Sequence, residues 1–372
     1  MPTYSAASIK KAIVFSSNLA ILAFYAANVA ANWNHDAFRL FLTTKLKQVW
    51  PFLLLTEPAF MLIMPFVPKP RCVTTTTKVE CAAKPTIGEA KLMAISTAAI
   101  DYLVVGALLL FWDTICRLED GSICPFTAAG TLLVGFTVMS IKDDIQCRFL
   151  WKKFISPYKL NSWPHTWQRT FDIIFTSPLF SFLACLGLCL SGWVSFESIK
   201  NPKVLLQVQL ESMVITDGIT NLFMMFGHKW LHDKLYFLHR KHHKASNKCL
   251  MIYGAPQFDL LDMVIEFGAG VPGLIVVKKI LFGPSSKVHF LTYGLFAMKA
   301  FQTHSGNPYS PVYFVPLLDH LARTTICHNL HHVIQNDYFS IVPHQHLWNP
   351  EARKRDIDLY NKHLMTQFPR SV

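Results

Sequence analysis

Charged residues are scarce in this chain, and the cysteine pairs that mark common metal and redox motifs are absent. Only 16% of the 372 residues are Asp, Glu, Lys or Arg, whereas soluble domains average about 25%. None of the nine cysteines belongs to a C-x-x-C pair, which removes the zinc-ribbon and thioredoxin-type signatures. Disorder is excluded as well, because 52% of the residues are hydrophobic and 29 are Phe.

Long apolar runs account for the low charge. They lie near residues 12–31, 49–67, 93–112, 126–141, 173–196, 204–226, 258–282 and 288–301. About 20 apolar residues span a bilayer as a helix, so the pattern predicts an all-α, polytopic membrane helix bundle. The run at 126–141 is short and fits a tilted or half-buried helix. Gly268, Gly270 and Pro272 favour a kinked helix or a re-entrant hairpin within 258–282.

The positive charge predicts the orientation of the bundle. The net charge is +12, but the basic residues lie between apolar runs and form no single stripe, which disfavours nucleic acid as a partner. The loops 68–92, 142–169 and 227–256 carry five, six and six Lys or Arg residues, and we expect them on the cytosolic side. Residues 113–125 then face the lumen, where Cys116 and Cys124 form either a disulfide or two reduced thiols.

Histidine is concentrated in the second half of the chain, where 14 of the 16 histidines fall at or after residue 228. Three clusters follow the patterns H-x-x-x-H, H-x-x-H-H and H-x-x-H-H, and one more histidine precedes the last cluster. The members are His228, His232, His239, His242, His243, His304, His328, His331 and His332. Residues three and four apart share a helix face, so each cluster presents several imidazoles together. Imidazole binds iron, copper, nickel and zinc, and eight or more ligands exceed what one zinc ion takes, which suggests two metal ions.

The three clusters resemble the histidine boxes of the fatty acid hydroxylase/sterol desaturase superfamily of integral membrane di-iron enzymes. The resemblance covers roughly residues 205–350 and is strongest from Trp230 to Lys244. It implies that the histidines of the three clusters are ligands of two iron ions. His304, in its His-Ser-Gly setting, resembles an additional family histidine that precedes the last box.

Two departures from the family pattern stand out. Asp259 occupies the position where the family often has a further histidine, so it is either a replacement ligand or the sign of a site that lacks one. His344 and His346 follow the last box at alternate positions, and we interpret them as plain surface residues. Nearby acidic residues (Asp233, Asp259, Asp262 and Asp337) are candidate acceptors for the outward N–H groups of metal-bound imidazoles.

The resemblance implies a membrane-bound di-iron oxygenase that hydroxylates or otherwise oxidises a lipid, such as a sterol, sphingolipid or fatty acyl chain, with O₂ and external electrons. Cytochrome b5 or an NAD(P)H-dependent reductase would supply the electrons. We expect N-terminal membrane helices over 1–203, a catalytic domain over 204–350 and a cytosolic tail over 351–372, in the endoplasmic reticulum membrane with the histidines facing the cytosol. Two alternatives stay open: a non-catalytic membrane protein that binds lipid or a partner through a degenerate metal site, and a histidine-rich metal transporter.

Overall fold

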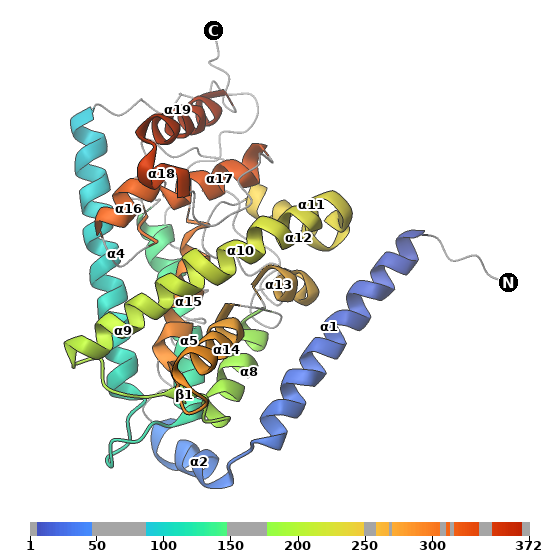
Figure 1. Ribbon diagram of the computed structural model, residues 1–372, viewed down its shortest axis with the longest axis vertical. Coiled ribbons are helices and arrows are strands. Elements are labelled where there is room, and N and C mark those ends of the chain that lie inside the picture. The colour runs from blue at the N-terminus through green and yellow to red at the C-terminus, as the bar shows by residue number, and fades with distance from the viewer. Residues whose placement is uncertain are drawn as a thin grey trace, which may run out of the picture.

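The computed structural model is predominantly helical (Figure 1), and it describes residues 6–46, 87–146, 177–248, 258–267, 270–305, 310–312, 316–334 and 344–366. Its elements are α1 Ala6–Ala31, α2 His35–Leu40, the π-helix η1 Phe41–Lys45, α4 Ile87–Ile115, α5 Pro125–Ile145, α8 Ser177–Leu190, strand β1 Val194–Ser195, α9 Pro202–Met213, the π-helix η3 Val214–Thr220, α10 Asn221–Phe223, the π-helix η4 Met224–His228, α11 Lys229–Lys234, α12 Tyr236–Lys248, α13 Leu260–Phe267, α14 Gly270–Phe282, strand β2 Val288–His289, α15 Phe290–Gln302, α16 Pro316–Ala322, α17 Thr324–Ile334, α18 His344–Trp348 and α19 Pro350–Thr366. The helical class predicted from the sequence is confirmed, since the described residues are predominantly helical and the two-residue strands β1 and β2 form the strand pair among them.

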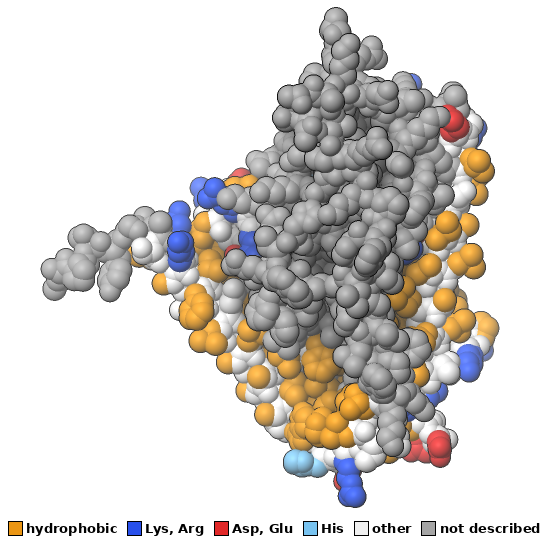
Figure 2. Space-filling view, turned by 180° about the vertical axis from the view of Figure 1, so that it is seen from behind, with side chains coloured by type: hydrophobic (Ala, Val, Ile, Leu, Met, Phe, Trp, Pro, Cys, Tyr) orange, Lys and Arg blue, Asp and Glu red, His pale blue; other side chains and the backbone are white. Residues whose placement is uncertain are grey.

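Three helical stretches in the described residues are long and apolar enough to cross a membrane: Ser8–Ala31, Ala94–Ile115 and Leu260–Phe282. They coincide with the predicted runs at 12–31, 93–112 and 258–282. Large apolar side chains are exposed along α1 and α4 (Figure 2), among them Phe15, Phe24 and Leu103. Exposed apolar faces of this extent fit contact with lipid and not with water, so the structure indicates a membrane protein.

The remaining predicted runs have mixed outcomes. Residues 126–141 and 173–196 give α5 and α8, and residues 288–301 give β2 and α15, none of which meets the same length and composition criteria. Residues 204–226 belong to a continuous helix that extends from α9 to α11 and crosses the molecule diagonally in Figure 1. The run at 49–67 lies outside the described residues.

The main apolar core lies between α1, α4, α5, α8 and α15. Trp112 of α4 is 1% exposed, and its indole Nε1 donates a hydrogen bond of 2.6 Å to the carbonyl oxygen of Thr131 on α5. Gly135 is required beside it, because a Cβ atom there would lie 2.5 Å from the Trp112 ring. This close contact fixes α5 against α4 and thereby positions the helix that carries Lys142 and Asp143.

A buried polar network joins the N-terminal helices to the histidine-bearing half. Asp101 of α4 accepts hydrogen bonds from Lys142 (2.6 Å) and Gln146 (2.9 Å) at the end of α5. Its other carboxylate oxygen accepts from Gln302 of α15 (2.8 Å) and Ser310 (2.6 Å). Contacts therefore cross the predicted boundary between residues 203 and 204, and the division into those domains stays a prediction.

Cys116 and Cys124 are both buried free thiols. Of the two alternatives for residues 113–125, a disulfide or two reduced thiols, the structure has the reduced one.

Most of the expected tail over 351–372 belongs to α19, which packs against α17 and α18 and buries Tyr360. The C-terminal segment up to Thr366 is therefore part of the fold that surrounds the histidines.

Candidate metal centre

Four helical segments bring the histidines together. The η4–α11 stretch carries His228 and His232, and α12 carries the second cluster. His304 follows the end of α15 by two residues, and α17 carries the third cluster. Helix α12 packs on both α11 and α17, so the i, i+3 and i+4 faces of each cluster point to a common interior.

Five imidazoles form the first group, here called the five-histidine group: His228, His232, His239, His243 and His331. Their Nε2 atoms face one another. His228 Nε2 lies 2.8 Å from His239 Nε2, 3.2 Å from His232 Nε2 and 3.2 Å from His331 Nε2. His243 Nε2 completes the set at 3.1 Å from His232 Nε2.

Four imidazoles form the second group, the four-histidine group: His242, His304, His328 and His332. Here too the contacts are between Nε2 atoms, with His304 Nε2 3.1 Å from His242 Nε2 and 2.9 Å from His328 Nε2, and His332 Nε2 3.0 Å from His328 Nε2. The two groups adjoin, because the ring of His243 lies 4.7 Å from that of His332, centroid to centroid. All nine histidines predicted from the sequence thus converge on one place.

The spacing of these nitrogens suits metal ions. Two neighbouring nitrogen ligands at about 2.1 Å from one ion lie about 3 Å apart in octahedral geometry, and the Nε2 pairs lie 2.8–3.2 Å apart. Eight of the nine side chains are buried. Burial, together with the neighbouring imidazoles, lowers the pKa of His232 to about 3. Burial also lowers the pKa of His304 to about 3. These imidazoles are therefore neutral at pH 7, the state in which Nε2 offers a lone pair to a metal ion.

Carboxylates stand behind the five-histidine group. His239 Nδ1 lies 2.9 Å from Asp262 Oδ1, which makes Asp262 an acceptor for the outward N–H of that ring. Glu266, one turn further along α13, has its Oε1 3.6 Å from His228 Nδ1 and its Oε2 3.8 Å from His239 Nδ1. Asp262 was among the candidate acceptors, whereas Glu266 was missed. The i, i+4 spacing of the two carboxylates on α13 was the available signal.

The four-histidine group has no such carboxylate among the described residues. His304 Nδ1 lies 3.0 Å from the carbonyl oxygen of Ala300. The Nδ1 atoms of His242, His328 and His332 are buried and have no hydrogen-bond partner in the described part of the chain. A divalent ion held by the five-histidine group would therefore have the carboxyl groups of Asp262 and Glu266 close behind its ligands, whereas the described residues place no carboxyl group behind the ligands of the four-histidine group.

Two predicted positions differ from the expectation. The structure does not bring Asp259 into either group; its Oδ1 lies 3.9 Å from Lys241 Nζ, and the preceding Phe258 stacks on the His242 ring at 3.8 Å. Asp233 is half exposed and pairs with Lys229, one turn earlier on the same helix. Asp337 lies outside the described residues.

The interpretation of His346 as a surface residue was wrong. His346 is 0% exposed, with Nδ1 2.9 Å from the carbonyl oxygen of Ala322 and Nε2 2.7 Å from Asp356 Oδ2. Cys327 Sγ lies 3.5 Å from the same Nε2. Asp356 lies ten residues further along the chain, on α19, and a contact between separate helices leaves no spacing signal in the sequence. The side chain of His344 lies outside the described set.

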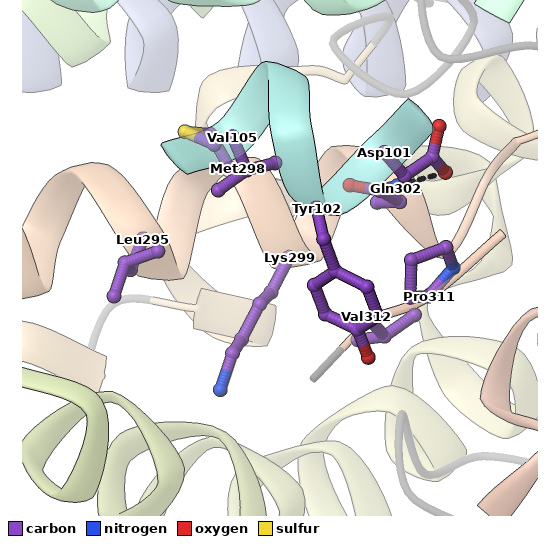
Figure 3. Close-up of a pocket in the computed structure, with 9 residues that line it drawn as sticks. All are labelled: Asp101, Tyr102, Val105, Leu295, Met298, Lys299, Gln302, Pro311 and Val312. Carbon is purple, nitrogen blue, oxygen red and sulfur yellow. Dashed lines mark hydrogen bonds between the residues drawn. The ribbon is translucent and has the colours of Figure 1, made fainter. Parts of the chain in front are cut away.

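A small pocket lies between α4, α15 and residues 311–312 (Figure 3), and Asp101, Tyr102, Leu295, Met298 and Lys299 are among its lining residues. The Asp101–Gln302 hydrogen bond closes one end, and the side chain of Lys299 points away from it. Gln302, which also lines the pocket, is two residues before His304 in the sequence.

The fold and this site define a helical protein of membrane type with two adjoining histidine groups able to bind metal ions. Comparison of the chain with models of protein families, with curated proteins and with solved structures found no match.

Proposed function

We propose that this protein is a membrane-bound di-iron oxygenase that hydroxylates, or otherwise oxidises, a lipid such as a sterol, a sphingolipid or a fatty acyl chain. The observation that carries the proposal is the convergence of nine Nε2 atoms into two adjoining groups, one of five and one of four. A single structural zinc ion takes four ligands, so this donor set is suited to a pair of ions.

The donor set also bears on the identity of the metal. Imidazole nitrogen suits iron, copper, nickel and zinc, and the histidine spacing resembles that of the di-iron superfamily. Two iron ions in these groups would supply the redox chemistry for reduction of O₂ and oxidation of a C–H bond. The nine histidines would hold them, and Asp262 would fix the orientation of the His239 ring through its Nδ1.

The surroundings of the site favour a lipid substrate. Helices α1 and α4 expose apolar side chains, and the pocket between α4 and α15 has apolar lining residues, among them Val105, Leu295 and Met298. A lipid that enters sideways from the bilayer would place one carbon near the metal pair, while the packed helices exclude bulk water from that carbon. We propose a location in the endoplasmic reticulum membrane with the histidines toward the cytosol, where cytochrome b5 or an NAD(P)H-dependent reductase would donate electrons.

Metal content tests this proposal. We expect about two iron ions per chain after anaerobic purification in detergent, measured by elemental analysis. A His239→Ala/His242→Ala variant removes one ligand from each group and should lose most of the iron. His35→Ala is the control, because His35 is exposed at the start of α2, and this variant should keep the iron.

Three results would contradict the proposal: a single zinc ion, no metal at all, or equal metal content in the double variant and the parent. Retention of two iron ions without any O₂-dependent lipid product, in a screen of sterols, ceramides and fatty acids with reductant, would favour the non-catalytic alternative.

A further inference from the structure

The continuous helix that leads to the five-histidine group has its polar side inward and its apolar side outward. Leu206, Leu210, Leu222 and Phe226 on this helix are each more than half exposed. The opposite side carries hydroxyl and amide side chains that are buried. Polar side chains that face the interior of a membrane bundle commonly line substrate, ion or water pathways.

Four of these inward side chains, here called the polar stripe, are Gln209, Ser212, Thr216 and Thr220, which are 8%, 0%, 1% and 0% exposed. None of their side-chain polar atoms has a hydrogen-bond partner in the described structure. From Ser212 onward these side chains are four residues apart, and the same spacing continues from Thr220 through Met224 to His228. The polar stripe therefore runs along one side of the helix toward a member of the five-histidine group.

Two π-helical segments keep the side chains of this row on one side of the helix. Four residues of α-helix rotate about 40° beyond a full turn, so a row with four-residue spacing drifts around an ordinary helix. The wider turns of η3 (Val214–Thr220) and η4 (Met224–His228) rotate less per residue and counteract that drift. Both π segments fall within the row itself, which gives them a geometric role.

The chemistry of the polar stripe points to water as its ligand. Hydroxyl and amide groups are neutral and can both donate and accept hydrogen bonds. From residue 209 to residue 220 the helix rises about 16 Å, which is too far for the one polar group of a lipid to reach all four side chains. Buried polar groups without protein partners are usually satisfied by ordered water. We propose that the polar stripe binds a file of water molecules that carries protons to the five-histidine group.

The role in proton transfer rests on the proposed function. Hydroxylation of a C–H bond consumes one O₂, two electrons and two protons; one oxygen atom enters the product as its hydroxyl group and the other leaves as water. The external reductase supplies the electrons. Eight of the nine histidines are buried, so the protons need a hydrated route through the helices, and the water formed can leave by the same route.

The presence of water can be tested without any activity. Thr216→Cys places a thiol on the polar stripe, and Ile215→Cys places one at the adjacent residue, which packs in an apolar cluster with Val271 and Phe296. Infrared difference spectra against the parent protein would isolate the S–H band of each new thiol after transfer of the nanodisc-embedded protein to D₂O. We expect the S–H band of Thr216→Cys to lie at lower frequency than that of Ile215→Cys, because its thiol is hydrogen-bonded to water. We expect the thiol hydrogen of Thr216→Cys to exchange for deuterium within the mixing time, and that of Ile215→Cys to exchange slowly. Equal, slow exchange at both positions would overturn the proposal.

The proton-transfer role needs a second measurement. In a Thr216→Val/Thr220→Val variant we expect unchanged iron content, about tenfold slower product formation and a larger solvent deuterium isotope effect. Thr127→Val on α5 is the control, since Thr127 is also buried with an unpartnered hydroxyl but lies off the stripe. Rapid thiol exchange with unchanged turnover in the double variant would overturn the proton-transfer role. Absence of iron and turnover in the parent would contradict the proposed function, and the infrared result would stand separately.

Discussion

At the scale of single residues, the orientation of each imidazole matters as much as its presence. The histidines of both groups turn Nε2 toward one another, which leaves Nδ1 to face outward. In the five-histidine group, His239 has a carboxylate at hydrogen-bond distance behind its Nδ1, that of Asp262, whereas the described residues place none behind the Nδ1 atoms of the four-histidine group. Outer acceptors of this kind raise the basicity of a ligand ring and hold its tautomer. The two groups are therefore expected to differ in metal affinity, with the tighter site in the five-histidine group.

Asp262→Asn tests this difference. Asparagine keeps the shape and one acceptor oxygen but removes the negative charge, so we expect one of the two metal ions to bind about 10-fold to 100-fold more weakly. Competition with a chelator, followed by metal analysis, measures the change. Asp259→Asn is the matched control three residues earlier, and it should leave both affinities as they are. Equal effects of the two substitutions would show that the charge of Asp262 has no specific role behind a ligand.

At the scale of elements, α17 is held by a buried contact that has no counterpart in the sequence motif. His346 of α18 bridges the carbonyl oxygen of Ala322, before α17, and the carboxylate of Asp356 on α19. The neighbouring Cys327 lies directly before His328 in α17. Helices α18 and α19 therefore brace the helix that presents His328, His331 and His332 to the metal groups.

His346→Ala should weaken the packing of α18 and α19 against α17. The substitution leaves the buried Asp356 carboxylate with Arg355 (3.1 Å) but without its imidazole, so we expect a loss of about 3 kcal/mol in the free energy of unfolding. Chemical denaturation in detergent measures it, with the exposed His35→Ala as a neutral control. A loss no larger than that of the control would show that the α18–α19 contact does not support the fold.

At the scale of the whole molecule, the membrane helices and the histidine-bearing helices are joined through one buried carboxylate. Asp101 accepts hydrogen bonds from α5, α15 and Ser310 at once. Lys142, its charged partner, is 8% exposed, although the sequence placed it in the basic loop 142–169 that we expected on the cytosolic side. The buried ion pair with Asp101 uses Lys142 to join helices, so Lys142 is not part of an exposed loop.

Asp101→Ala should therefore affect both halves of the chain. Removal of one partner leaves a buried ammonium without its carboxylate, which costs about 3–5 kcal/mol. Unfolding by denaturant measures the loss, and addition of Lys142→Met should restore part of it because the unpaired charge is then gone. No recovery in the double variant would mean that the hydrogen bonds to Gln302 and Ser310, and not the ion pair, carry the stability.

The sequence by itself determined the helical class, the apolar runs that became Ser8–Ala31, Ala94–Ile115 and Leu260–Phe282, and the nine histidines of the site. These follow from local rules: apolar length sets what can span a bilayer, and i, i+3 and i+4 spacing sets which side chains share a helix face.

Only the tertiary structure decided how the histidines divide. Neighbouring His331 and His332 on α17 fall into different groups, as do His242 and His243 on α12, because adjacent residues project in directions about 100° apart on a helix. Which group each joins depends on the helices packed on either side. The same holds for Glu266 behind the five-histidine group, for the burial of His346 and for the exclusion of Asp259, since contacts between residues distant in sequence depend on helix packing, which local spacing does not specify.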